Sequence, residues 1–152
     1  MSVIVKSYRK EREAEIISGL QSAMEKVGAI VERQAKSNII VNSAQNPWER
    51  TGQTASSVTH NVKIEGNEIY TEIGIPDKAT TKDGKSVAKV GKWLELGHPQ
   101  HPGQYVPAIG KRLVASEVPP YPWLFPAVES NREKIIDILK KSGGKSISIT
   151  GG

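Results

Sequence analysis

Three side chains in the middle of the sequence have the chemistry of a metal site. Glu95, His98 and His101 are spaced three residues apart, and zinc is bound by histidine nitrogens and carboxylate oxygens. Pro99 and Pro102 interrupt this segment, so we expect a loop, whereas the zinc-protease motif places its ligands on a helix. The pattern favours an exposed histidine-containing loop. A metal-dependent hydrolase that uses these residues is a third hypothesis, and we predict no metal and no cofactor.

The sequence contains no other arrangement that is typical of catalysis. No serine lies in a Gly-x-Ser-x-Gly elbow. Gly84, Gly91 and Gly97 form no phosphate-binding loop, and Gly110-Lys111 lacks the other residues of a P-loop. His60 lies in a strand pattern, which is typical of a packed or half-exposed residue. We assign no catalytic residue and predict that the chain is not an enzyme.

Length and composition predict one small domain with a thin hydrophobic core. The chain has 152 residues, of which 37% are hydrophobic and 5% aromatic, with 14 glycines and 9 prolines. We expect a single domain over residues 1–141 and a flexible C-terminal tail over residues 142–152. Because a monomer of this composition is expected to be marginally stable, burial against other subunits would stabilise it.

The charge is moderately basic and spread along the chain. There are 21 basic and 16 acidic residues, which gives a net charge of +5. The basic clusters at 6–12 and 134–145 lie at the ends or on the faces of expected helices, which favours a solvated surface. The alternative is a small basic DNA-associated protein that contacts phosphates without sequence specificity. It predicts one continuous basic face and a steep loss of binding with salt.

The sequence also indicates a cellular compartment. It contains no cysteine, which excludes disulfides and fits a reducing compartment. No apolar run approaches the roughly 20 residues needed to span a bilayer. Residues 1–6 lack the long apolar region of a signal peptide. We expect a soluble protein made in a cytoplasm, with no membrane partner.

A long amphipathic helix is predicted over residues 7–39. Apolar residues recur there at steps of three and four, and charged residues fill the opposite face. The apolar stripe consists of Ile16, Leu20, Met24, Val27, Val31 and Ala35, flanked by Ile17 and Ile30. A helix of about 30 residues is longer than average for a globular domain. We therefore expect it to extend past its own core and to rest partly on a neighbour.

A β-hairpin is predicted after a loop over residues 42–50 and a short turn over 51–57. Val58, Val62 and Ile64 alternate with polar residues and share a face with His60. A second alternating set consists of Ile69, Thr71, Ile73 and Ile75. Glu65-Gly66-Asn67 supplies the turn between the two runs.

The middle of the chain is predicted to consist mostly of loops. Residues 77–88 are polar and without periodicity, which indicates a mobile surface loop. We expect a short helix over 90–96, ended by Gly97. A second loop over 98–103 would lead to a strand over 104–114, which Pro107 confines to an edge.

A rigid extended strap is predicted for the proline run within residues 118–129. It contains four prolines within eight residues, interleaved with three aromatic residues, and proline favours extended geometry. Pro126 can start a last helix that runs to Lys141. The capping-box spacing of Ser130 and Glu133 offers an alternative start. Val128, Ile135, Ile136 and Leu139 make the expected buried side.

These elements predict an α+β fold. A long N-terminal helix and a C-terminal helix would pack on a small, mainly antiparallel β-sheet with long loops.

Three motifs follow one another in a characteristic order: Pro47–Val58, Trp93–Gly97 and Pro120–Glu129. This order resembles the tail-component (neck) family of HK-type tailed phages, which is akin to the lambda-like minor tail protein Z that completes the tail. Members typically show Pro-x-Asp-Thr-Gly-x-Leu-x-x-Ser-Ile, then an aromatic-x-Glu-aromatic-Gly-Thr pattern, then Pro-x-Pro-Phe-Leu-x-Pro-Ala. The match covers roughly residues 19–139.

The chain departs from these patterns at several positions. Trp123 replaces the usual Phe of the third motif, which fits best. Glu49-Arg50 and Thr54 depart from the first motif, and Leu96 and His98 from the second. The segments 77–88 and 98–117 are longer than the family pattern implies. These departures affect what the resemblance implies about the exact role and the neighbours of the chain, more than the family itself.

The resemblance implies a structural virion protein that acts at the head–tail junction of a tailed bacteriophage. Such proteins complete the tail or make it competent for joining, usually as homo-oligomeric rings, most often hexameric, around the DNA channel. The implied partners are tail tube, tail terminator or head-closure proteins and the double-stranded DNA in the channel. The implied location is the virion, after assembly in the host cytoplasm.

We interpret seven residues as candidates for contacts between subunits or with partners. The first helix would supply one surface through Leu20, Met24 and Val27. Aromatic residues dominate interface energetics, so we expect Trp93, Tyr121, Trp123 and Phe125 to anchor the strap and neighbouring contacts. The competing interpretation is that all four aromatic residues fill the core of their own subunit.

Overall fold

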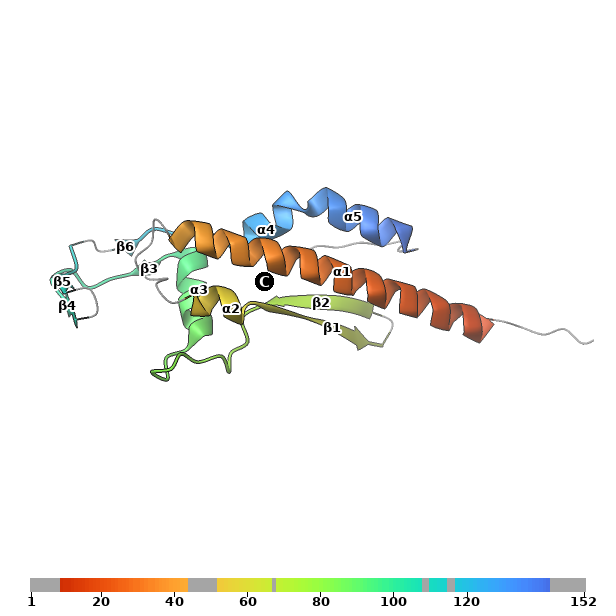
Figure 1. The fold of residues 1–152 in the computed structure, drawn as a ribbon, viewed down its shortest axis with the longest axis horizontal. Helices are drawn as coiled ribbons and strands as arrows, with labels where there is room; N and C mark the ends of the chain where they lie inside the picture. Colours follow the sequence, from red (N-terminus) through yellow and green to blue (C-terminus); the bar gives the residue numbers. More distant parts are fainter. Residues whose placement is uncertain (1–8, 44–51, 67, 108–109, 115–116, 143–152) are drawn as a thin grey trace, which may run out of the picture.

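The computed structural model describes residues 9–43, 52–66, 68–107, 110–114 and 117–142. Helix α1 (Arg9–Ser43) has 35 residues, which corresponds to about 53 Å at 1.5 Å per residue. The hairpin of β1 and β2 lies along one side of α1, and α4 and α5 lie along another (Figure 1). The fold is α+β, as predicted, with small antiparallel sheets.

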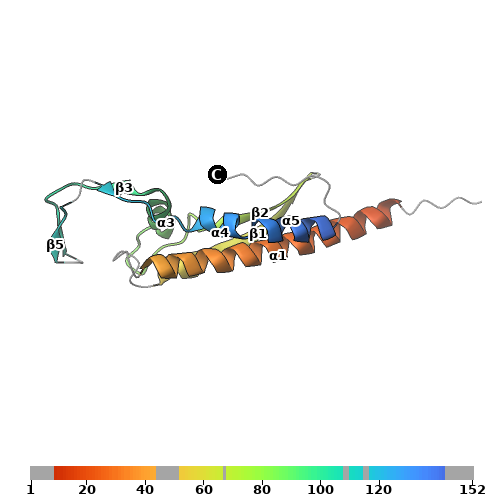
Figure 2. The same ribbon diagram turned by 90° about the horizontal axis from the view of Figure 1, so that it is seen from above.

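The core is a narrow layer along the middle and C-terminal part of α1. Its α1 contribution is a stripe with four-residue spacing: Ala23, Val27, Val31, Ala35 and Ile39. The predicted stripe began too early, because Ile16 is 53% and Ile17 44% exposed. The first turns of α1 project past the hairpin and past α5 (Figures 1 and 2). The helix therefore extends past its core, as its length led us to expect.

The predicted hairpin is confirmed. Strand β1 (Thr59–Glu65) pairs antiparallel with β2 (Glu68–Gly74), and Glu65 lies opposite Glu68. Gly66 has a φ of +59°, which a two-residue hairpin turn requires and glycine adopts without strain. The segment before the hairpin differs from prediction, because α2 (Gln53–Ser57) is a short helix that buries Thr54 and Ala55. Asn42 and Ser43 belong to α1, and the rest of the predicted 42–50 loop lies outside the described residues.

Helix α3 (Val87–Leu96) begins three residues before the predicted start. The Ser86 side chain accepts a hydrogen bond from the Lys89 amide and caps the helix, and Val87 is buried. The preceding loop folds back on itself through an antiparallel bridge between Thr80 and Ser86. Gly97 follows the helix, as predicted, with a φ of +73°.

The segment 104–114 contains strand structure, as predicted, but as two short strands that pair in a small hairpin instead of one strand. Strand β4 (Tyr105–Val106) pairs with β5 (Lys111–Arg112), and Gly110 with φ +62° lies in the turn. The predicted loop over 98–103 begins with β3 (His98–Pro99), which pairs with β6 (Glu117–Val118). Both pairs extend from the α3 end of the molecule (Figure 1).

The C-terminal region contains two helices instead of one. Helix α4 (Leu124–Ser130) begins two residues before Pro126, and α5 (Arg132–Lys141) follows after a break at Asn131. The Asn131 side-chain amide donates to the Ala127 carbonyl oxygen at 2.9 Å. The proposed capping box is wrong, because no side chain caps α5 and the Ser130 hydroxyl donates to Ala127 instead.

The buried side of these helices differs from prediction at one position. Ile135 and Leu139 are buried and Val128 packs against the core, as expected. Ile138, and not Ile136, is the further isoleucine that packs there. The predicted flexible tail over 142–152 lies, except for Ser142, outside the described residues.

Candidate functional site

The junction of α3, the proline strap and α4 is held together by the Glu95 carboxylate. One oxygen, Oε2, accepts hydrogen bonds from the backbone amides of Trp123 (2.7 Å) and Leu124 (2.8 Å). The other, Oε1, accepts from the amide of Phe125 at 3.0 Å. The first amides of a helix have no partner within the helix and carry partial positive charge. Glu95 satisfies three of them, which explains why α4 begins before Pro126.

Trp123 connects three helices from inside the core. Its side chain is 4% exposed, and its indole nitrogen donates to the Gly91 carbonyl oxygen at 2.9 Å. The Asn38 side-chain amide on α1 donates to the Trp123 carbonyl oxygen at 2.9 Å. A Cβ at position 91 would lie 2.6 Å from Ile75 Cδ1 and 3.4 Å from Trp123 Cζ2. The end of the Ile75 side chain therefore packs closely on α3 at Gly91, and Trp123 lies in ordinary contact with the same turn.

Gly97 lets the strap pass closely over the end of α3. A Cβ at position 97 would lie 2.6 Å from the Val118 carbonyl oxygen, and its φ of +73° also favours glycine. The Tyr121 amide donates to the Leu94 carbonyl oxygen at 2.7 Å. The strap is therefore fixed to α3 through its backbone.

Large apolar side chains remain exposed on this fixed junction. Trp93 is 39%, Leu96 66% and Phe125 63% exposed. The Trp93 ring stacks on His98, with centroids 4.8 Å apart, and Lys89 Nζ lies 5.0 Å from a Trp93 ring centroid. These contacts orient the tryptophan without covering it.

The structure separates the seven predicted contact residues. Trp123 and Val27 are buried in the chain's own core and are not accessible to a neighbour in this conformation. Leu20, Met24 and Tyr121 are half-buried, while Trp93 and Phe125 are exposed. The interpretation that all four aromatic residues fill the core therefore describes Trp123, but neither Trp93 nor Phe125.

The three residues of the metal hypothesis do not converge on one point. Both Glu95 oxygens accept backbone hydrogen bonds from α4. His98 stacks on Trp93, and burial lowers the pKa of His98. Within the ranges that the structure describes, no group of three or more His, Cys, Asp or Glu side chains is placed to hold a metal ion.

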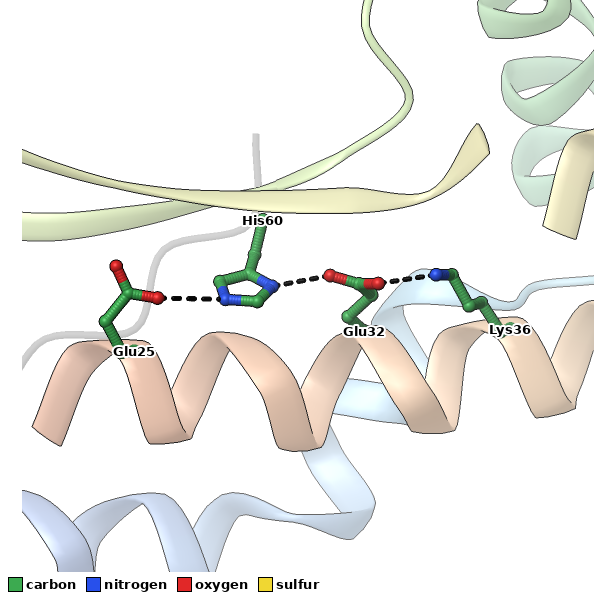
Figure 3. Close-up of polar contacts among 4 residues, drawn as sticks. All are labelled: Glu25, Glu32, Lys36 and His60. Carbon is green, nitrogen blue, oxygen red and sulfur yellow. Dashed lines mark hydrogen bonds and ion pairs between the residues drawn. The ribbon is translucent and has the colours of Figure 1, made fainter. Parts of the chain in front are cut away.

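A second polar cluster joins the hairpin to α1, and sequence reasoning did not identify it. The ring of His60 on β1 lies between two carboxylates of α1 (Figure 3). His60 Nδ1 is 2.5 Å from Glu32 Oε2, and Nε2 is 3.2 Å from Glu25 Oε2. Lys36 Nζ approaches the other Glu32 oxygen at 2.5 Å. The carboxylates bind opposite ring nitrogens, so this cluster is an ion-pair chain and not a chelating site.

Gly28 makes room for this histidine. Glu25, Gly28 and Glu32 lie on one face of α1, and a Cβ at position 28 would lie 2.3 Å from His60 Cδ2. The spacing of these residues, together with a single inward-facing histidine in the first strand, is the sequence signal that could have revealed the cluster.

The cluster shifts the pKa values of two of its members. The hydrogen bond to Glu32 raises the pKa of His60, burial opposes the rise, and Glu25 supports it. Burial acts to raise the pKa of Glu32, but the hydrogen bonds from Lys36 and His60 outweigh it and lower that pKa. Both shifts favour the charged forms, a histidinium between carboxylates.

Comparisons with protein-family models, with curated proteins and with solved structures find no match for this chain. Among the described residues, no helix combines the length and the apolar character needed to cross a bilayer.

Proposed function

We propose that this chain is a structural virion protein of a tailed bacteriophage. It acts at the head–tail junction, in tail completion or head–tail joining, as one subunit of a homo-oligomeric ring around the DNA channel. Its partners are neighbouring neck and tail proteins, such as the tail tube, tail terminator or head-closure protein, and the DNA that passes through.

The observation that carries this proposal is the exposed apolar surface on the hydrogen-bonded junction of α3, the proline strap and α4. Trp93, Leu96 and Phe125 are exposed, while Glu95 and Trp123 hold the backbone that presents them. Exposed apolar groups on a rigid support are typical of protein–protein contacts. Two of the three motifs of the resemblance agree with this interpretation, because the second and the third form this junction.

Deletion of the gene from the element that encodes it tests the proposal. We expect electron microscopy to show heads and tails that are complete but not joined, or tails of abnormal length if the chain terminates the tail. Supplying the chain from a plasmid should restore joined particles, and mass spectrometry should detect about six copies per particle. Normal joined particles from the deletion strain would contradict the proposal.

The second candidate function is a basic DNA-associated protein. It is favoured by five exposed lysines on α3 and the segment before it: Lys78, Lys82, Lys85, Lys89 and Lys92. DNA binding through these groups would fall steeply with salt.

A further inference from the structure

The two faces of the hairpin are in different environments. Alternation along the strands places His60, Val62 and Ile73 on the face toward α1, which is the element packed extensively on the hairpin. The opposite face presents the other set: Asn61, Lys63, Glu65, Glu68, Tyr70 and Glu72. Figures 1 and 2 show α1 along one side of the hairpin. The face with the second set is the one turned away from α1.

This outer face of the hairpin is acidic. It holds three carboxylates, Glu65, Glu68 and Glu72, and one ammonium group, Lys63, which pairs with Glu72 at 2.7 Å. The hydrogen bond with Glu65 raises the pKa of Tyr70 to about 12, with smaller contributions from burial and from the charges of Glu65, Glu72 and Glu68. The surface therefore favours a cationic partner.

The exposed face of α3 has the complementary chemistry. Lys89, Lys92, Trp93 and Leu96 have the spacing that places side chains on one side of a helix, and all four are exposed. The opposite side of α3 buries Val87, Gly91 and Leu94. Glu95, the acidic residue of α3, is bonded to α4. The exposed face is therefore cationic and apolar, and the preceding turn carries Lys82 and Lys85 with the exposed Asp83 between them.

These two faces cannot pair fully within one molecule. The hairpin extends away from α3 (Figure 1). Its tip, with Glu65 and Glu68, lies about 20 Å along the strands from the α3 end, at about 3.3 Å per residue. Their complementarity is therefore available to two copies of the chain. A contact between different surfaces of identical subunits is heterologous, and it closes into a ring when the rotation permits.

We infer that the outer face of the hairpin of one copy docks on the exposed α3 face of a second copy. Glu65, Glu68 and Glu72 meet Lys89 and Lys92, while Trp93 and Leu96 are covered. This inference rests on the proposed function, because the ring brings the second copy into place. Charge pairs of this kind set orientation and partner choice, and salt weakens them.

Paired charge reversals test the contact. The variant Glu68→Lys/Glu72→Lys presents basic surfaces on both sides, and Lys89→Glu/Lys92→Glu presents acidic surfaces on both sides. We expect each variant alone to associate at least about tenfold more weakly than the native chain, by light scattering over a concentration series. An equimolar mixture should regain the native mass, because the two variants can alternate around a ring.

A matched control changes charge elsewhere. Lys140→Glu/Lys141→Glu makes the same change on exposed residues of α5 and should leave the mass unchanged. Circular dichroism and thermal unfolding should show that all variants fold.

Because the native chain has no cysteine, Glu72→Cys and Lys89→Cys chains can also be mixed, and we expect the mixed disulfide to form in preference to either homodimer.

The outcomes separate the inference from the proposed function. A native oligomer whose mass neither reversal changes overturns the inference and leaves the ring intact. A native monomer at every concentration, without mixed disulfide, overturns the contact, while the deletion experiment still decides the role in head–tail joining. If Lys89→Glu/Lys92→Glu keeps the native mass but loses DNA binding, the inferred contact between copies is wrong. The lysines of α3 would then bind nucleic acid instead.

Discussion

At the scale of single residues, Gly28 and His60 depend on each other. Glycine in the interior of a helix costs about 1 kcal/mol against alanine, so two glycines in α1 call for different explanations. Gly28 lies under the His60 ring, whereas nothing lies within 4 Å of a Cβ built at Gly19. Packing against His60 therefore requires glycine at position 28, but no contact requires it at position 19.

Replacing each glycine by alanine should therefore have opposite effects. We expect Gly19→Ala to increase the free energy of unfolding by between zero and about 1 kcal/mol. Gly28→Ala should lower it, because the new methyl group displaces His60 from both glutamates. Urea unfolding of the two variants measures the difference, and equal stabilisation by both would contradict the packing described for Gly28.

The same histidine makes stability depend on pH. Because the folded-state pKa of His60 is raised above 6.5, its contribution is fully present below about pH 6.5 and is lost as pH rises through the raised value. Because the pKa of Glu32 is lowered below 4.5, its contribution is present above about pH 4.5 and is lost as pH falls through the lowered value. The ion pairs are therefore strongest between these limits.

His60→Gln should remove about 0.5–1 kcal/mol of stability near pH 5.5 and much less at pH 9. The comparison is the difference between native and variant chains in urea unfolding at the two pH values. This difference isolates His60 from His98, whose lowered pKa acts in the opposite direction. A loss of equal size at both pH values would show that the histidine acts by packing alone.

At the scale of elements, the hairpin could be predicted from the sequence, but the start of α4 could not. The hairpin depends on local alternation and a turn glycine, both of which are visible in the sequence. Helix α4 begins at Leu124 because the Glu95 carboxylate, 29 residues earlier, accepts its first amide hydrogens. The proline pattern alone placed the start at Pro126. The break at Asn131 has a similar cause, a side-chain contact with Ala127 that periodicity does not reveal.

Glu95→Gln tests this account of α4. An amide retains one acceptor oxygen but loses the charge and the second acceptor, so we expect a loss of about 1–2 kcal/mol in the free energy of unfolding. Glu129→Gln, which removes an exposed pair with Arg132, is the control and should cost less than about 0.5 kcal/mol. The Glu95→Gln effect should be the same with and without added zinc. A zinc-dependent difference would instead support the metal hypothesis.

At the scale of the whole molecule, the sequence predicted the fold class and the overhang of α1, but not which aromatic residues face outward. Trp123 and Phe125 are two residues apart in one motif, yet they are 4% and 63% exposed. Their difference arises from contacts with α1 and α3, elements far away in the sequence. The sequence could therefore identify the segment that contains the candidate contact surface, but it could not identify which side chains of that segment are exposed.

These two aromatic residues should separate folding from assembly. Trp123→Ala should lower the free energy of unfolding by about 3–5 kcal/mol, because it leaves a cavity in a thin core. Phe125→Ala should change it by less than about 0.5 kcal/mol and should instead weaken association. Thermal unfolding and light scattering on both variants make the test. Strong destabilisation by Phe125→Ala would show that it supports its own subunit.

The mass of the native chain in solution, measured by light scattering over a concentration series, tests whether the chain forms the proposed ring. We expect a discrete species near six times 16.5 kDa, which dissociates at high salt and shows no larger aggregates. A monomer of 16.5 kDa at every concentration would contradict self-assembly through the surfaces described above.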